Sequence, residues 1–167
     1  MGETREMQAL ALLFLLGCAG ATVPVPVLPP IHDRAIVFGQ RVGPVSLGMT
    51  EEQLFAAVGE VAATSYGGNR AGYRYAKLAL NVVIDTGRVV SIGPTDGTYA
   101  TAAGVRVGAS EATLQASAPP AAATQRHGTT ATYCYADHTL VTVGATATPV
   151  CAAGTVCDIV LGGCTPP

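Results

Sequence analysis

Apolar residues take a helical spacing in one short stretch in the first half of the chain. Leu54 and Val58 lie four positions apart, which places them on the same face of a helix. Thr50 can accept a hydrogen bond from the backbone of Gln53, whose side chain can reach back to Thr50, and this reciprocal pair is a capping box. Gly59 is suited to end the helix. The pattern predicts a short amphipathic helix that begins after Thr50.

Three segments with the composition of strands follow this helix. Apolar, β-branched and aromatic residues dominate residues 72–77, 79–85 and 88–94. An Asp-Thr-Gly sequence between the last two segments is typical of a hairpin turn. The Gly-, Asn- and Arg-rich stretch between the helix and the first segment has no such pattern, and we expect it to be a loop. The sequence therefore predicts a helix followed by a three-stranded meander.

The same pattern occurs again 60 residues later. Fifteen of the 39 positions from 45 to 83 carry the same residue 60 positions further on. After a seven-residue insertion, residues 87–92 match residues 154–159. The second set of strands is expected at residues 131–136, 138–144 and 155–161. The sequence therefore predicts a tandem duplication.

The predicted fold class is α+β. Two tandem units, each a helix plus three strands, would form an antiparallel sheet with the helices packed on one face. We expect the first unit at residues 36–98 and the second unit at residues 99–167. Their strands could form one continuous curved sheet across both units.

The N-terminal part of the chain has the composition of a targeting segment and a tether. The apolar run from Ala9 to Gly17 is too short to span a bilayer and is typical of a signal peptide. It ends in Leu-Leu-Gly-Cys, which resembles the lipobox of bacterial lipoprotein precursors and implies cleavage before Cys18 and lipidation of that cysteine. Residues 1–17 would then be a lipoprotein signal peptide, and residues 18–35 the lipidated cysteine and a proline-rich tether.

The residue after the cysteine bears on where such an anchor would lie. Ala19 stands where lipoproteins of the enterobacterial kind carry an acidic retention signal. We therefore expect a lipid anchor at Cys18 in the outer membrane, facing the periplasm, with palmitate among the acyl chains. The alternative is an ordinary secretory signal with an incidental cysteine, which would make the protein secreted.

Composition argues against a nucleic-acid partner. Only 12% of the residues are charged and the formal net charge is −2, so no basic surface is expected. The chain has no Trp and three Phe residues. Val, Leu, Ala and Tyr must therefore fill its core.

Four cysteines besides Cys18 lie in the predicted second unit, at Cys134, Cys151, Cys157 and Cys164. An even number of cysteines in an exported chain predicts two disulfides. A zinc site is the alternative, although the sequence lacks a C-x-x-C pair. Our preferred pairing joins Cys151 to Cys157 as a local loop and Cys134 to Cys164, which would tie the tail to the sheet.

Tyrosines recur in pairs at equivalent positions of the two units, namely Tyr73 with Tyr75 and Tyr133 with Tyr135. Residues two apart on a strand share a face, so each pair would lie on one face of the sheet. Tyr is favoured at protein interfaces, which makes these four residues candidate partner-binding residues. The alternative is that the tyrosines lie under the helices and replace Phe and Trp in the core.

Residue types that carry catalysis are scattered. His32, His127 and His138 form no recognisable motif, and no Ser lies in a nucleophile elbow. Glu51 and Glu52 in the first turn of the predicted helix would repel a phosphate. We therefore expect no enzyme activity, no metal site and no cofactor. A hydrolase with an ionisable cluster near the insertion is the alternative.

The stretch "GPVSLGMTEEQLFAAVG", from residue 43, resembles a motif of the small-protein-A/outer-membrane lipoprotein A superfamily. "AAGVRVGASEATLQASAP" resembles the second half of related secreted lipoproteins, so the resemblance covers about residues 40 to 162. The duplicated layout is similar to that of β-lactamase inhibitory protein. The resemblance implies a non-catalytic protein-binding or envelope-assembly role with an envelope protein as partner. A secreted inhibitor or scavenger module is the alternative.

Overall fold

The computed structural model describes residues 32–145 and 151–167. The predicted signal peptide, Cys18 and most of the predicted tether lie outside the described residues. Within those residues, none of the helices combines the length and the apolar composition that crossing a membrane requires.

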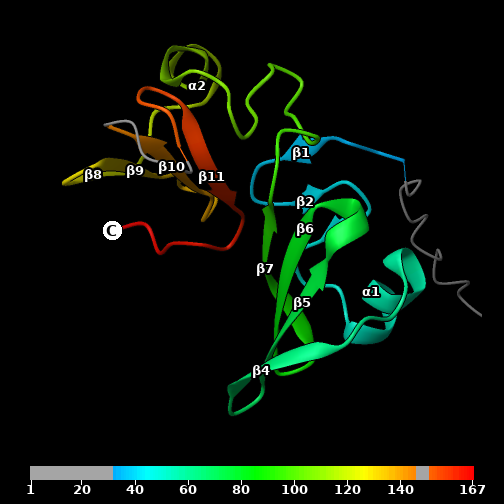
Figure 1. Ribbon diagram of the computed structural model, residues 1–167. Helices are drawn as coiled ribbons and strands as arrows, with labels where there is room; N and C mark the ends of the chain where they lie inside the picture. Colours follow the sequence, from blue (N-terminus) through cyan, green and yellow to red (C-terminus); the bar gives the residue numbers. More distant parts are fainter. Residues whose placement is uncertain (1–31, 146–150) are drawn as a thin grey trace, which may run out of the picture.

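The described part of the chain is mostly β-structure, with eleven strands in three antiparallel sheets and only two short α-helices (Figure 1). The predicted α+β class, with one helix and three strands in each unit, is therefore wrong. The elements are β1 (Ile36–Val37), β2 (Arg41–Val42), β3 (Val45–Ser46), α1 (Glu51–Val58), β4 (Ala63–Gly67), β5 (Arg70–Tyr75), the 3₁₀ turn η1 (Ala76–Leu78), β6 (Leu80–Asp85), β7 (Arg88–Pro94), α2 (Glu111–Ser117), β8 (Ala123–His127), β9 (Thr130–Cys134), β10 (Leu140–Gly144) and β11 (Val156–Val160).

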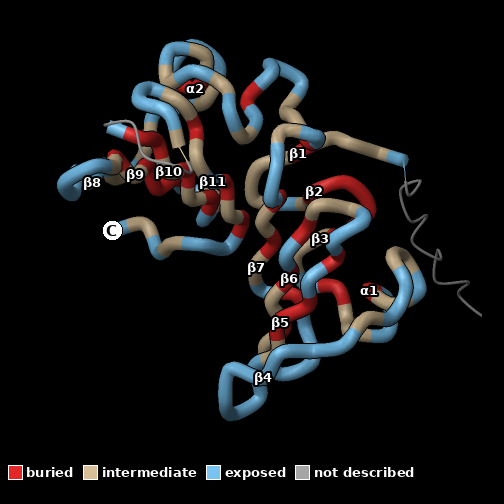
Figure 2. Tube along the Cα trace, in the orientation of Figure 1, coloured by how far each residue is buried: buried red, intermediate tan, exposed pale blue. Residues whose placement is uncertain are grey.

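Two strands of the large sheets, β4 and β8, are missing from the prediction. Every residue of β4 is exposed, and four of the five residues of β8 are (Figure 2). Neither strand alternates apolar and polar positions, because each is an edge strand held by backbone pairing to its neighbour, β5 or β9. The sequence pattern of these segments therefore resembles that of a loop.

Each unit contains one helix and a four-stranded sheet of the same order. The first sheet runs β4-β5-β6-β7 and the second runs β8-β9-β10-β11. The small sheet β1-β2-β3 precedes the first helix. Leu54 of α1 and Leu114 of α2 are fully buried and belong to the core that each helix forms with its sheet.

Backbone hydrogen bonds join the start of each helix to the last strand of its sheet. The N–H of Gly48 donates to the carbonyl of Val89 at 2.8 Å, and the N–H of Val89 donates to the carbonyl of Met49 at 2.8 Å. The second unit has the same two bonds. The N–H of Gly108 donates to the carbonyl of Val156, and the N–H of Val156 donates to the carbonyl of Ala109, both at 2.7 Å. These bonds occur between positions that the predicted alignment, including its seven-residue insertion, makes equivalent.

The two helices are capped as the sequence predicts. Thr50 accepts from the backbone N–H of Gln53 at 3.2 Å, and the side chain of Gln53 accepts from the Thr50 N–H at 2.9 Å. Ser110 accepts from the N–H of Thr113 at 3.1 Å. Only α1 therefore has a complete capping box among the described helices.

The four paired tyrosines lie in the core, under the helices. Tyr73 donates a hydrogen bond to the carboxylate of Glu51, and Tyr133 donates one to the carboxylate of Glu111. Each bond therefore joins the first residue of a helix to the middle of the sheet. The core interpretation of the tyrosines agrees with this placement, whereas an interface would need them to be exposed.

The two large sheets remain separate and meet at one point. Ile92 of β7 and Leu161, just after β11, exchange two backbone hydrogen bonds of 3.1 and 2.9 Å. Gly162 follows with φ of +70°, and a Cβ atom there would lie 2.0 Å from the Val90 carbonyl oxygen. The expected continuous sheet is therefore absent from the described residues, because pairing between the edge strands is limited to this bridge.

A second contact joins the small N-terminal sheet to the second unit. The rings of Phe38 and Tyr135 lie 5.6 Å apart, and the N–H of Gly39 donates to the hydroxyl of the fully buried Thr139 at 3.0 Å. The two units therefore share a packed boundary as well as the strand bridge.

Both predicted disulfide pairs are present. Cys134 of β9 is bonded to Cys164 in the tail, and Cys151 is bonded to Cys157 of β11. The first closes a long loop that contains β10 and β11, and the second closes a short one.

Replacing Tyr73 by Phe should remove the hydrogen bond to Glu51 and lower the free energy of unfolding at pH 7 by about 1–2 kcal/mol. In the intact protein this bond, with burial acting in the same direction, raises the pKa of Tyr73 from 10.0 to about 12. Folding therefore favours the neutral phenol. Its contribution is complete below pH 10.0 and is lost as the pH rises toward about 12. Denaturant unfolding as a function of pH measures the effect.

The same series contains its control. Tyr133→Phe should behave alike, because its hydrogen bond to Glu111, followed by burial, raises the pKa of Tyr133. Glu51→Gln keeps an acceptor but removes the charge, so the pKa of Tyr73 in the folded protein should fall, and the alkaline loss should be smaller and complete at a lower pH. An alkaline loss in Tyr73→Phe as large as in the wild type would contradict this account.

Removing the two disulfides should have unequal effects. The Cys134–Cys164 bond spans 30 residues and the Cys151–Cys157 bond spans 6. Chain entropy then predicts that the Cys134→Ala/Cys164→Ala variant loses about 3–4 kcal/mol of its free energy of unfolding. The Cys151→Ala/Cys157→Ala variant should lose about 2 kcal/mol. Unfolding in denaturant measures both, and peptide mapping that found Cys134 joined to Cys157 would contradict the pairing.

Candidate functional site

The face of the first sheet that points away from α1 carries polar side chains and one exposed aromatic ring. We call this surface, with its continuation onto β11, the open face. Its residues are Tyr66, Arg70, Gly72, Arg74, Asn81, Val83, Asp85, Ser91 and Asp158. The alternate residues of the same strands, such as Val82 and Ile84, are buried against the helix side.

Two shallow hollows lie next to each other on the open face. One has a volume of about 200 Å³ and is bounded by Tyr66, Arg74 and Asn81 among others. The other has a volume of about 220 Å³ and reaches from Asn81 across β7 to Asp158 of β11. Because Asn81 and Val83 border both hollows, the surface is continuous from the edge strand β4 to the junction of the two units.

Tyr66 is the most exposed large hydrophobic residue of the open face, with 62% of its surface accessible. A β-bulge between Ser65 and Gly67 makes Tyr66 the extra residue of its strand. Such a bulge breaks the alternation of side chains and can redirect one of them. The sequence around Tyr66 thus folds so that a large ring lies on an otherwise polar strand.

The ring of Tyr66 lies against Gly72 of the neighbouring strand. A Cβ atom at Gly72 would be 2.5 Å from the Tyr66 ring, so only glycine leaves room for this position. An aromatic ring that covers a strand glycine shields the backbone beneath it. The absence of a side chain at Gly72 thereby lets the Tyr66 ring approach the sheet while most of its surface stays exposed.

Charged and polar residues flank the ring. Arg70 and Asp85 are partners across β5 and β6 and form an ion pair of 3.7 Å between exposed side chains. Arg74 and Asn81 are the partners at the other end of these strands. Arg and Tyr are both enriched at protein interfaces, and Arg offers several hydrogen-bond donors at once.

Asp158 forms the far end of the open face. A β-bulge at Cys157 places both Cys157 and Asp158 beside the hollow, and the equivalent bulge at Val90 occurs in β7. Burial by the surrounding protein raises the pKa of the Asp158 carboxyl, although the backbone N–H of Ile159 acts in the opposite direction. The side chain still reaches solvent and can accept hydrogen bonds from a partner.

The paired tyrosines that the sequence singled out lie elsewhere, whereas Cys157 borders one of the hollows. The four paired tyrosines are buried on the helix side of the sheets. Within the described ranges, His, Cys, Asp and Glu residues form no cluster of three or more that could hold a metal ion. Sequence reasoning missed Tyr66, whose one signal is its position before the Gly67-Gly68 pair in a stretch without alternation.

The open face offers an aromatic ring, an ion pair, and hydrogen-bond donors and acceptors on a firmly paired sheet. These groups are suited to recognising another surface. Comparisons with protein families, with curated proteins and with solved structures find no match for this chain. The assignment of a function therefore depends on the site itself.

Proposed function

We propose that this protein is a non-catalytic, protein-binding lipoprotein of the bacterial cell envelope, and that the open face binds its partner. The observation that carries the proposal is the exposed ring of Tyr66, which lies against Gly72 at the β4 end of a polar sheet face. A rigid aromatic side chain with a polar tip loses little conformational entropy on binding, and Tyr is therefore common among the residues that dominate binding energy.

The shape of the face favours a macromolecule over a small molecule. Small-molecule sites usually have volumes of about 300 Å³ or more. The two hollows, at about 200 and 220 Å³, are smaller than this. The two hollows are open and adjacent, so a partner surface could cover both at once. The mixed charges give no preference for a polyanion such as nucleic acid.

The envelope location rests on the N-terminal sequence. The Leu-Leu-Gly-Cys motif and the proline-rich segment after it would place the folded units at the end of a semi-rigid tether. The resemblance of the helix-start motif to the small-protein-A/outer-membrane lipoprotein A superfamily supports the same role. The two disulfides are compatible with an oxidising compartment such as the periplasm.

Replacing Tyr66 by Ser should weaken partner binding by about tenfold or more, because truncating an aromatic anchor commonly costs this much. The recovery of cross-linked partners from envelope fractions, with the full-length chain as bait, measures the loss. Arg126→Ser is the control, since Arg126 stands 60 positions after Tyr66 and its exposed side chain pairs with Glu111 on the helix side of the second sheet. Equal losses in the two variants, or none in Tyr66→Ser, would contradict the proposed surface.

Replacing Cys18 by Ser should abolish the incorporation of labelled palmitate and release the protein from the membrane fraction. The wild type should be labelled, because acyl chains would be attached at Cys18. Two or three such chains would anchor it stably in the membrane. Radioactive palmitate labelling followed by membrane fractionation measures both properties. An unlabelled wild-type protein in the culture medium would instead favour the secreted inhibitor.

A further inference from the structure

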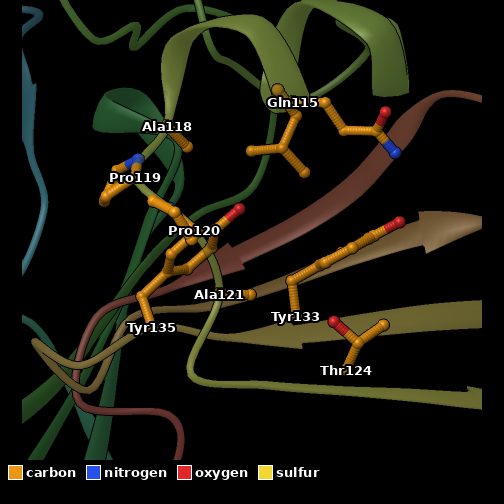
Figure 3. A pocket seen from close by; sticks show the side chains of 9 residues that line it. Gln115, Ala118, Pro119, Pro120, Ala121, Thr124, Tyr133 and Tyr135 are labelled. Carbon is orange, nitrogen blue, oxygen red and sulfur yellow. The ribbon is translucent and has the colours of Figure 1, made fainter.

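A cavity of about 240 Å³ lies between α2 and the second sheet. The helix contributes Gln115, and the segment after it contributes Ala118, Pro120 and Ala121 (Figure 3). The rings of Tyr133 and Tyr135 form the opposite wall, as Figure 3 shows. This cavity lies on the helix side of the second unit and shares no residue with the open face of the first unit.

The first unit fills the equivalent space with its own side chains. Phe55, Val58 and Val61 stand 60 positions before Gln115, Ala118 and Ala121, and all three pack against the core. The Phe55 ring meets the Tyr73 ring edge-on, with 5.4 Å between the centroids and 82° between the planes. The second unit therefore lacks one aromatic ring and two branched side chains at these positions.

The residues that surround Phe55 in the first unit have close counterparts in the second unit. Leu114 is as deeply buried as Leu54. Tyr133 is held by Glu111 in the way that Tyr73 is held by Glu51. In the first unit Phe55 packs against Tyr73. The second unit has the equivalent tyrosine, Tyr133, bonded to its helix in the same way.

The size and chemistry of the cavity suit a single ring. An apolar cavity of about 150 Å³ is enough to bind benzene, whereas drug-sized ligands need about 300 Å³ or more. Tyr135 lines the cavity, is only 3% exposed and carries a phenol hydroxyl. This hydroxyl points toward the helix side of the cavity (Figure 3) and can bond a polar substituent on a bound ring.

We infer that this cavity binds one aromatic ring, in the position that Phe55 occupies in the first unit. The ring can belong to a side chain of a partner protein or to a free aromatic molecule. In both cases it stacks edge-on against Tyr133 and excludes water from Ala118 and Ala121. Its binding does not depend on Tyr66 or on the proposed partner surface, so the two proposals can fail separately.

The experiment titrates two probes, p-cresol and N-acetyl-phenylalanine amide, into the protein and records NMR shifts of the Ala118 and Ala121 methyl groups. Saturable shifts with millimolar or lower dissociation constants are expected for at least one probe. Saturation by p-cresol alone identifies a free molecule as the ligand, and saturation by the amide alone or by both shows that a protein side chain fits. The absence of saturation by either probe, or equal saturation by cyclohexanol, would overturn the inference.

A filling variant tests the position of the ring. Gln115→Phe should raise the melting temperature by about 2–4 °C and abolish the shifts caused by the probes, because it restores the packing of the first unit. Tyr66→Ser, which lies outside the cavity, should bind the probes as the wild type does. Undiminished probe binding in a folded Gln115→Phe variant, or lost binding in Tyr66→Ser, would overturn the position assigned to the ring.

Discussion

The attachment of a helix start to the last strand of a sheet governs both halves of this molecule. Paired backbone hydrogen bonds join the residues before each helix to β7 or β11. The first helical residue, Glu51 or Glu111, then accepts a hydrogen bond from a tyrosine at the centre of the sheet. A carboxylate at this position also interacts favourably with the helix dipole. One short motif therefore caps the helix, orients it and anchors it to the core.

The two units keep this attachment and differ in what surrounds it. The first unit packs Phe55 against Tyr73 and has the complete capping box. The second unit has smaller side chains at these places and contains both disulfides. Because cross-links limit the entropy of the unfolded chain, they can offset a core with less buried apolar area. The first unit therefore fills this place with side chains, whereas the second unit has a cavity of about 240 Å³ there.

The sequence was most informative where local chemistry decides the structure. The capping box and the disulfide pairs are predicted from residue types and their positions, and the structure has both. The edge strands β4 and β8 could not be predicted from alternation, because backbone pairing rather than burial holds them. Within the described residues, strand pairing between the two sheets is limited to the Ile92–Leu161 bridge, and no local pattern encodes this limit.

The candidate site was harder to predict than the fold. The tyrosines that attract attention in the sequence are the ones that the core needs, since Phe is scarce and Trp is absent. The exposed Tyr66 depends on a bulge in β4 and on a glycine in the next strand, which become adjacent only when the strands pair. The cavity under α2 becomes visible only when the two units are compared in space.

The central claim is that the open face of the first sheet is the surface that meets a protein partner. Photocross-linking in cells of the producing organism tests it most directly, with p-benzoylphenylalanine placed at position 66 in one strain and at position 126 in another. The account predicts a discrete cross-linked protein from position 66 and none from position 126. A discrete product from position 126 with none from position 66 would contradict it.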